Sequence, residues 1–340
     1  MAHLSCLIAT SFLLLPAIAP GQSDRQGNTA LKVYEAAQAI AMADSTVGAL
    51  PLQGALPSRL TAGVRAQDVV SYLAPGFAYP ARNIGLQCQG VNATLADVPQ
   101  GSVQVQPVGG EAESRFGEVK LLGGRVFRLQ ASASDSLGVG VSPRCELVAY
   151  PMPDSALPQG ETFWFAFSFW ADDWSGTQDE QLIAQFHVQE SRNILLNPFF
   201  AMVVRGGELR VELRHNERQT PDQASTMVVT AARLAMPARQ WVSAVVQARV
   251  ANDPAQSPFL RLWLNGQLVA DYAGPLGYKL PPSGHAYPKV GVYHWLNGNA
   301  WDMRKPTRVL LIGSLLCLRD DTGRYSLDQV AAAVAPPMQR

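Results

Sequence analysis

Short apolar runs in which every second residue is hydrophobic limit what this chain can fold into. The clearest example extends from Phe163 to Trp170, where positions 163, 165, 167 and 169 are all phenylalanine. A β-strand sends alternate side chains to opposite faces, so the run predicts a strand with one face in a core. Similar expected strands cover residues 119–122, 126–131, 147–150, 182–187, 199–204, 209–213, 241–250, 259–264, 290–295 and 309–318. This pattern predicts an all-β sandwich of two antiparallel sheets.

The strand pattern begins near residue 85, which divides the chain into expected parts. Residues 1–21 are expected to be a signal peptide and residues 22–84 a partly helical amino-terminal extension, with helical spacing between residues 29 and 44. The sandwich is expected over residues 85–325 and a carboxy-terminal tail, as a short helix or a frayed end, over residues 326–340. Within the sandwich, Asn265 and Gly266 predict a tight hairpin turn.

The first residues have the polarity of a secretory signal. An apolar run from Leu4 to Ala19 is followed by Pro20 and Gly21, and it is too short and too weakly flanked for a membrane-spanning helix. The alternative is an uncleaved, buried apolar segment. Charges interrupt every later candidate span. We therefore expect a protein without a membrane span that is secreted or periplasmic after cleavage.

Composition excludes some function classes. The 340 residues are 47% hydrophobic and 16% charged, which is enough apolar material for a large core. Lysine and arginine total 27 and aspartate and glutamate total 27, whereas a nucleic-acid binder normally has a basic surplus. We expect no nucleic-acid partner, and a monomer.

Cysteine usage gives one weak structural expectation. Cys6 would leave with the signal peptide, so Cys88, Cys145 and Cys317 remain in an oxidising compartment. Cys145 lies between two polar residues of an expected strand and is interpreted as a small buried hydrophobe. The expected disulfide therefore joins Cys88 to Cys317. No cysteine spacing indicates a structural zinc site.

Three segments carry polar residues two or four positions apart, the spacing that places side chains on one face of a strand. Arg144 and Glu146 form the first pair and Gln185 and His187 the second. The third segment runs from Tyr287 to Tyr293 and includes Lys289. The residues between them are of the kind that a strand turns toward its core. We therefore expect one cleft lined by cations, an amide, an acid and an imidazole.

These segments resemble a known enzyme family. Alginate lyases of polysaccharide lyase family seven carry Arg-Ser/Thr-Glu-Leu, Gln-Ile/Val-His and Tyr-Phe-Lys-Ala-Gly-x-Tyr strands in this order, and residues 144–147, 185–187 and 287–293 match their polar positions. The context around residues 198–200, 206–209 and 263–266 looks more like the heparin lyase I and glucuronan lyase group. The resemblance implies a β-jelly-roll with a concave cleft. Cys145 and Pro288 depart from the alginate lyase pattern, and the proline predicts that the third strand begins there.

The resemblance implies cleavage of a uronate polymer by β-elimination. Arg144 would neutralise the substrate carboxylate and Gln185 would add an amide donor, so that charge developing during removal of the C5 proton is stabilised. His187 is the candidate base and Tyr293 the candidate acid for the leaving oxygen at C4. In a second assignment Tyr293 performs both proton transfers, and the sequence leaves both open.

Four further residues are candidates for substrate binding: Lys289, Glu146, Trp295 and Tyr287. Each also has a structural interpretation. Glu146 can be an ion-pair partner that holds Arg144 or Lys289 in place. The aromatic residues can be core residues or platforms against which sugars stack.

An acidic loop supplies the weak metal candidates Asp172, Asp173 and Asp179. Calcium is an option there, but the spacing fits no recognised calcium loop and a solvated acidic loop is the preferred interpretation. No cofactor is required by the sequence. A glycoside hydrolase would need two acids that face one bond, and no strand carries such a pair.

Taken together, these observations predict a secreted polysaccharide lyase that acts on an anionic, uronic-acid-containing polysaccharide and leaves unsaturated uronate ends. Alginate or glucuronan is the expected substrate type, followed by a heparin-like glycosaminoglycan. The alternatives are a lectin-like carbohydrate-binding sandwich without catalysis and, less favoured, a glycoside hydrolase.

Overall fold

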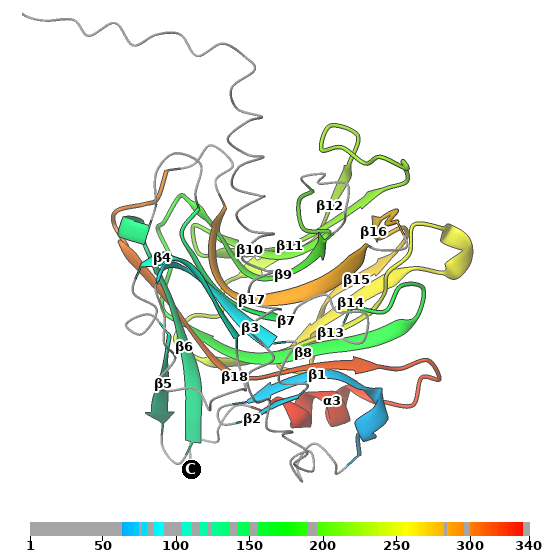
Figure 1. Ribbon diagram of the computed structural model, residues 1–340, viewed down its shortest axis with the longest axis horizontal. Helices are drawn as coiled ribbons and strands as arrows, with labels where there is room; N and C mark the ends of the chain where they lie inside the picture. The colour runs from blue at the N-terminus through cyan, green and yellow to red at the C-terminus, as the bar shows by residue number, and fades with distance from the viewer. Residues whose placement is uncertain are drawn as a thin grey trace, which may run out of the picture. The chain divides into compact units, whose positions relative to one another are not determined.

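The strands form two sheets that pack face to face, as the alternating hydrophobic residues of the sequence predict (Figure 1). The structure is a computed structural model that describes residues 63–74, 77–79, 84–91, 104–110, 116–121, 124–135, 142–149, 156–189, 196–281, 284–295 and 300–335. All of these lie in one unit, Ser45–Arg340. The expected signal peptide and the helical spacing at residues 29–44 lie outside the described residues.

Sheet 1 contains nine strands among the described residues, and its main path has the order β15-β14-β13-β8-β18-β1-β2, with β6 also paired to β18 and β5 to β6. Its strands are β1 (Val69–Ala74), β2 (Phe77–Tyr79), β5 (Phe116–Leu121), β6 (Gly124–Ser132), β8 (Thr162–Ala171), β13 (Trp241–Arg249), β14 (Phe259–Leu264), β15 (Gln267–Ala273) and β18 (Thr307–Arg319). Asn265 and Gly266 join β14 to β15 with φ angles of 49° and 79°. Two successive positive φ angles match the predicted hairpin turn.

Sheet 2 also has nine described strands, in the order β12-β11-β10-β9-β17-β7-β3-β4, with β16 beside β11. Its strands are β3 (Ile84–Val91), β4 (Gln104–Gly110), β7 (Arg144–Ala149), β9 (Glu180–Gln189), β10 (Phe200–Arg205), β11 (Glu208–Asn216), β12 (Met227–Ala235), β16 (Gly277–Tyr278) and β17 (His285–Trp295). Among the described strands only β3–β4 and β11–β16 pair in parallel. The three segments with the polar spacing lie on β7, β9 and β17, and these strands are direct neighbours.

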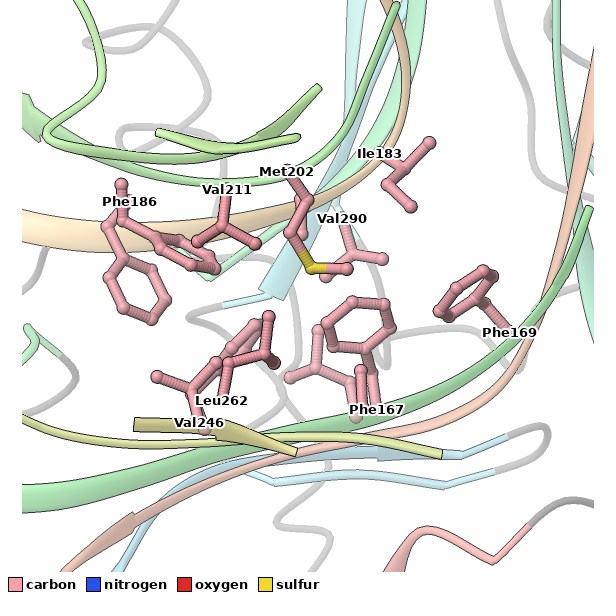
Figure 2. Packing of buried hydrophobic residues seen from close by; sticks show 14 of the residues in the cluster. Phe167, Phe169, Ile183, Phe186, Met202, Val211, Val246, Leu262 and Val290 are labelled. Carbon is pink, nitrogen blue, oxygen red and sulfur yellow. The ribbon is translucent and has the colours of Figure 1, made fainter. Parts of the chain in front are cut away.

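The main core lies between the sheets and is built from the alternating residues. The four phenylalanines of β8 are all fully buried. They meet Phe186 of β9, whose ring centroid lies 5.2 Å from that of Phe165 and 5.8 Å from that of Phe163. Figure 2 shows side chains of both sheets pointing toward one another, including Met202, Val246 and Val290. Burial of this aromatic area is the main force that holds the two sheets together.

A second core covers the other face of sheet 1. The helix α3 (Leu327–Ala333) begins at a capping box formed by Ser326 and Gln329, and it buries Val330 and Ala333. These residues belong to a cluster that includes Tyr72 of β1 and Trp164 of β8. The helix packs against β13 and β8 of sheet 1. No helix of the described residues is both long enough and apolar enough to cross a bilayer.

This second core corrects the expected boundaries. β1 lies within residues 22–84, yet it pairs with β18, and all six of its residues are buried. Residues 69–74 are thus an integral strand of the sandwich rather than an extension. Likewise, α3 lies within the expected tail but forms part of a core. The strand pattern missed β1 because a strand buried on both faces shows no alternation. It also missed β12, a mostly exposed edge strand.

Two expectations about individual residues are wrong. Cys317 is a free, buried thiol, and burial raises its pKa to about 12, so it does not pair with Cys88. Cys145 is the disulfide-bonded cysteine, and Cys88 lies opposite it in the register of β3 and β7. β17 does not begin at Pro288 but at His285. Proline is tolerated inside this central strand because the ladder with β7 starts only at the next residue, Lys289.

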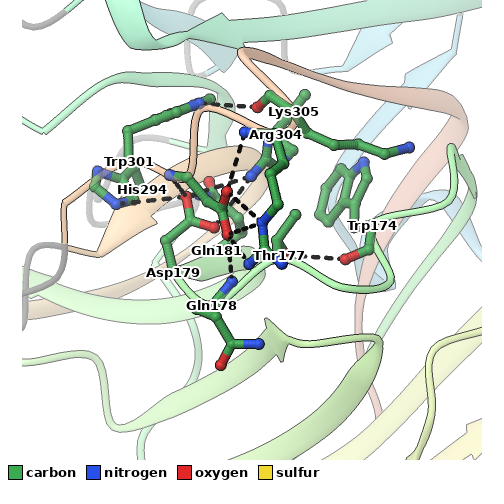
Figure 3. Close-up of polar contacts among 11 residues, drawn as sticks. Trp174, Thr177, Gln178, Asp179, Gln181, His294, Trp301, Arg304 and Lys305 are labelled. Carbon is green, nitrogen blue, oxygen red and sulfur yellow. Dashed lines mark hydrogen bonds and ion pairs between the residues drawn. The ribbon is translucent and has the colours of Figure 1, made fainter.

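A buried ion pair also bridges the sheets at Asp179, which Figure 3 shows near Gln181 and His294. Arg308 of β18 and Asp179, next to β9, are 0% and 1% exposed, with Nη2 and Oδ1 3.1 Å apart. Asp179 also accepts hydrogen bonds from the Gln181 side chain at 2.9 Å and from the backbone N–H of Asp302 at 3.1 Å. Burial lowers the pKa of His294, whose Nε2 lies 3.7 Å from Asp179. The neutral imidazole leaves Arg308 as the counterion of Asp179.

Removal of Arg308 leaves the buried charge of Asp179 without its counterion. We expect Arg308→Met to lower the free energy of unfolding by about 3–5 kcal/mol, measured by denaturant titration. The matched control is Arg319→Met. Arg319 lies on the same strand and pairs with Glu161 at 3.3 Å, but the two side chains are 44% and 48% exposed. Its loss should cost about 1 kcal/mol or less. Equal costs for the two variants would contradict a structural role for the buried pair.

Candidate functional site

Three adjacent strands position the predicted site residues. β17 lies between β9 and β7, with Tyr287 opposite His187 and Lys289 opposite Gln185 on one side. On the other side, Tyr293 lies opposite Arg144. Because residues two apart share a face, the side chains singled out in the sequence emerge on one side of sheet 2. The intervening Val290 and Val292 point into the core and are fully buried.

A cavity of about 300 Å³ opens on this face. It contains six of the eight predicted site residues: Arg144, Gln185, His187, Lys289, Tyr293 and Trp295. His187 lies opposite Tyr287, six residues before Tyr293 on β17, yet both His187 and Tyr293 line the cavity. Figure 1 shows that β17 is curved. Segments far apart in the sequence therefore converge as expected. Glu146 and Tyr287 do not line the cavity.

Glu146 lies beneath the cavity and binds the residues that line it. Its carboxylate is 1% exposed, and one oxygen accepts a hydrogen bond from the Gln185 amide. The other oxygen lies 3.9 Å from Arg144 Nη1 and 4.0 Å from Lys289 Nζ. A buried carboxylate between two cations fixes both of them and leaves one net positive charge at the floor of the cavity. In this position Glu146 orients residues that line the cavity and does not line it itself.

His187 is held at one nitrogen and is neutral. Nδ1 lies 2.8 Å from the Val188 carbonyl oxygen and 2.9 Å from the Val188 nitrogen. The ring packs beside Tyr287, with the centroids 5.8 Å apart. Burial first, and then the charges of Lys289 and Arg144, lower the pKa of His187 to about 3. The imidazole is therefore uncharged at neutral pH and available to accept a proton.

Two cations stack on the tyrosines of β17. The guanidinium carbon of Arg144 lies 4.0 Å from the centroid of the Tyr293 ring, and Lys289 Nζ lies 5.4 Å from that of Tyr287. Lys289 is 4% exposed, and burial lowers its pKa to about 8 although Glu146 acts in the opposite direction. Stacking of this kind fixes the orientation of the phenol while the guanidinium stays in the cavity.

Five further residues that line the cavity were not predicted: Ser142, Leu196, Asn197, Pro198 and Gln223. Arg214 donates from Nη1 to the Pro198 carbonyl at 3.0 Å and stacks on Trp295 at 4.8 Å. Pro198 lies in the context that resembles the glucuronan lyase group, but turn residues such as Gln223 carry no periodic signal. Only the folded chain brings them to the cavity.

The three aspartates proposed as metal ligands form ion pairs or hydrogen bonds with other residues of the protein. Asp172 pairs with Lys305 and Arg239, each at 3.5 Å, and Asp173 accepts a hydrogen bond from the Ser175 N–H. Asp179 is the partner of Arg308, as described above. Within the described residues, no group of three or more His, Cys, Asp or Glu side chains is suited to holding a metal ion.

Close contact between β17 and β7 depends on Gly291. A Cβ at this position would lie 2.2 Å from the Cys145 carbonyl oxygen and 2.5 Å from the Glu146 Cα. Because both are backbone atoms, Gly291→Ala must move β7, and we expect kcat/KM to fall at least about tenfold through displaced orientation. Gly63→Ala is the control, since its φ is not in the left-handed region and its Cβ would meet only the flexible Gln329 side chain, at 3.1 Å. Wild-type activity in Gly291→Ala would contradict the need for this contact.

Known structures resemble this one only distantly. A glucuronan lyase from the fungus Trichoderma reesei has 15% identity and a TM-score of 0.51, covering 60% of this chain and 87% of that chain. A family 7 alginate lyase has 15% identity and a TM-score of 0.49, covering 73% of this chain and 97% of that chain. An alginate lyase from Pseudomonas aeruginosa has 18% identity and a TM-score of 0.41, covering 61% of this chain and 86% of that chain. The first likeness shows a shared fold.

Sequence comparison is more decisive. No curated protein sequence matches the chain. A family model described as polysaccharide lyase, however, matches residues 115–315. This range is more than half of the chain, and it contains every residue that lines the cavity. The chain therefore belongs to the polysaccharide lyase family, with the β-jelly-roll fold that its sequence motifs predict.

Proposed function

We propose that this polysaccharide lyase cleaves a uronic-acid-containing polysaccharide by β-elimination and leaves unsaturated uronate ends. The observation that carries the proposal is the composition of the cavity. Arg144 and Lys289 supply positive charge, His187 supplies a neutral imidazole that can act as the base, and Tyr293 supplies a phenol that can act as the acid. No aspartate or glutamate is among the described lining residues. A glycoside hydrolase would need two such carboxylates at the bond.

Carboxylate neutralisation is the first requirement of the reaction. A uronate carboxylate makes the neighbouring C5 proton only weakly acidic, because its removal creates a second negative charge. Arg144 presents a planar fork suited to a carboxylate, and Lys289 adds a second cation nearby. Gln185 is fully buried, with its oxygen bonded to no described group, and its amide nitrogen is held by Glu146. The site is thus preorganised for charge that develops in the transition state.

Proton transfer then completes the elimination. His187 accepts the C5 proton, the electrons of the C–H bond form the C4–C5 double bond, and the bond from C4 to the leaving oxygen breaks. Tyr293 donates its hydroxyl proton to that oxygen, and exchange with water restores both side chains. The reaction uses the tautomer in which Nδ1–H donates to the Val188 carbonyl, because this tautomer has its lone pair on Nε2. The reaction needs no co-reactant.

Substrate binding itself strengthens the base. The cations Lys289 and Arg144 contribute to the low pKa of His187 in the free enzyme. A substrate carboxylate that binds them cancels part of this charge, so the imidazole becomes more basic once the uronate is in place. The same coupling discourages proton uptake by the empty site.

An alginate or glucuronan type polymer is the proposed substrate. The balanced total charge, 27 basic against 27 acidic residues, favours a polymer with one carboxylate per acidic sugar over a highly sulfated one. The names of the related structures, glucuronan lyase and alginate lyase, support the same choice. We also propose that the enzyme is exported. The apolar segment from Leu4 to Ala19 and the disulfide at Cys145 support export.

Tyr293→Phe and His187→Gln test the proton transfers. Each should lower kcat by about 10²- to 10⁴-fold, because each removes a group that transfers a proton. Tyr293→Phe keeps the ring that stacks with Arg144 and should leave the unfolding midpoint unchanged. The assay follows the ultraviolet absorbance of the conjugated double bond during incubation with a panel of polyuronates. Tyr272→Phe on β15, which loses a hydrogen bond to the Pro275 carbonyl, is the control and should keep full activity.

The alternatives give different results in this assay. New reducing ends without ultraviolet absorbance would indicate a hydrolase, and binding without any product would indicate a lectin. Wild-type turnover in Tyr293→Phe would remove the phenol from the mechanism.

Lys289 should set the alkaline limb of the pH profile. Its pKa of about 8 means that the ammonium loses its charge as the pH rises through that value, so kcat/KM should fall there. Lys289→Arg should move this limb upward by at least one pH unit, since a guanidinium stays charged. Lys305→Arg, whose lysine pairs with Asp172, is the control. An unshifted limb in Lys289→Arg would assign the limb to another group.

A further inference from the structure

The residues that line the cavity fall into a charged group and an uncharged group. The floor of the cavity holds Arg144 and Lys289, fixed by Glu146. Four uncharged residues outside the strands also line the cavity, namely Leu196, Asn197, Pro198 and Gln223, and this set is called the neutral wall. Arg214 stands behind this wall, where its guanidinium is occupied by Glu212, the Pro198 carbonyl and the Trp295 ring. The wall therefore offers hydrogen bonds without positive charge.

Gln223 is carried by a loop that has a fixed internal structure. The loop joins β11 to β12, and Asn216 at its base is 3% exposed. The Asn216 amide nitrogen donates to the Asp222 carbonyl at 3.1 Å, to Ser225 Oγ at 2.9 Å and to Thr226 Oγ1 at 3.1 Å. These bonds close the loop on itself.

The Asp222 side chain completes the turn. It accepts a hydrogen bond from the Ser225 N–H at 2.7 Å and pairs with Arg218 at 3.0 Å. Both the charge of Asp222 and that of Arg218 are thus used within the loop. The next residue, Gln223, is exposed and reaches the cavity. A preformed turn that presents an amide loses little conformational entropy on binding.

We propose that Gln223 is a specificity-determining residue whose amide binds hydroxyl groups of the sugar that adjoins the uronate held by Arg144 and Lys289. This inference rests on the proposed function. An amide both donates and accepts, which matches hydroxyl groups. A second carboxylate would be poorly placed at this wall, because the nearest charged groups of the loop are paired with each other and Asp222 itself is negative.

Replacement of Gln223 by alanine and by glutamate tests the chemistry of the group that it binds. Gln223→Ala should raise KM about three- to tenfold with kcat unchanged, the loss of one hydrogen bond between neutral groups. Gln223→Glu should stay within about threefold of the wild-type KM, because a carboxylate accepts hydrogen bonds from hydroxyls. Gln267→Glu, an exposed glutamine of β15, makes the same change in net charge and is the control, assayed at about 0.15 M ionic strength.

The same variants are compared by calorimetry in the Tyr293→Phe background, which measures the Kd of a uronate oligosaccharide without turnover. Weaker binding in Gln223→Ala, with near-normal binding in Gln223→Glu, supports the inference. An unchanged KM and Kd in Gln223→Ala would overturn it. So would a larger loss in Gln223→Glu than in Gln223→Ala, which would show that the wall meets a carboxylate, or an absence of binding to any uronate oligosaccharide.

Failure of the proposed function has a separate signature. It would appear as wild-type protein that binds the oligosaccharide but produces no ultraviolet absorbance, and the Kd comparison would still decide the role of Gln223.

Discussion

One buried carboxylate organises the site. Glu146 holds Gln185 by a hydrogen bond and attracts both Arg144 and Lys289, so three strands contribute to one charge arrangement. Because the carboxylate is 1% exposed, little water screens these attractions. The excess of one positive charge that remains is what a uronate carboxylate would neutralise. The low pKa of His187 has the same origin, since burial and the two cations all disfavour its charged form.

The rigidity of the sandwich makes this arrangement possible. β9, β17 and β7 are packed from below by the aromatic core and by the close contact at Gly291, so their side chains have few alternative positions. Sheet 1 is in turn covered by sheet 2 on one face and, in part, by α3 on the other. Such a scaffold can hold reacting groups with the precision that proton transfer demands. The neutral wall is different in kind, because it is formed by hydrogen-bonded loops rather than by strands.

Several details of the fold were beyond the reach of pattern and spacing. Cysteine usage along the chain favoured Cys317 as a disulfide partner, but in the fold Cys317 is a free, buried thiol of β18. Cys145 is the disulfide-bonded residue. Pro288 suggests the start of a strand, yet it lies inside the central strand β17. The proline is tolerated because the pairing of β17 with β7 begins only at the next residue, Lys289. β1 is buried on both faces and shows no alternation, so it was assigned to an extension. In each case a neighbour distant in sequence decides the outcome.

The amino-acid sequence by itself determined that the chain forms a sandwich of two sheets, which side chains of β7, β9 and β17 share a face, and which family they resemble. The reason is local, since alternation along a strand follows from backbone geometry. Only the tertiary structure decided that Glu146 lies beneath the cavity, that the pKa of His187 falls, and that Gln223 and Asn197 line the cavity. Burial and electrostatic coupling depend on which strands and loops become neighbours in space, and no single segment encodes that.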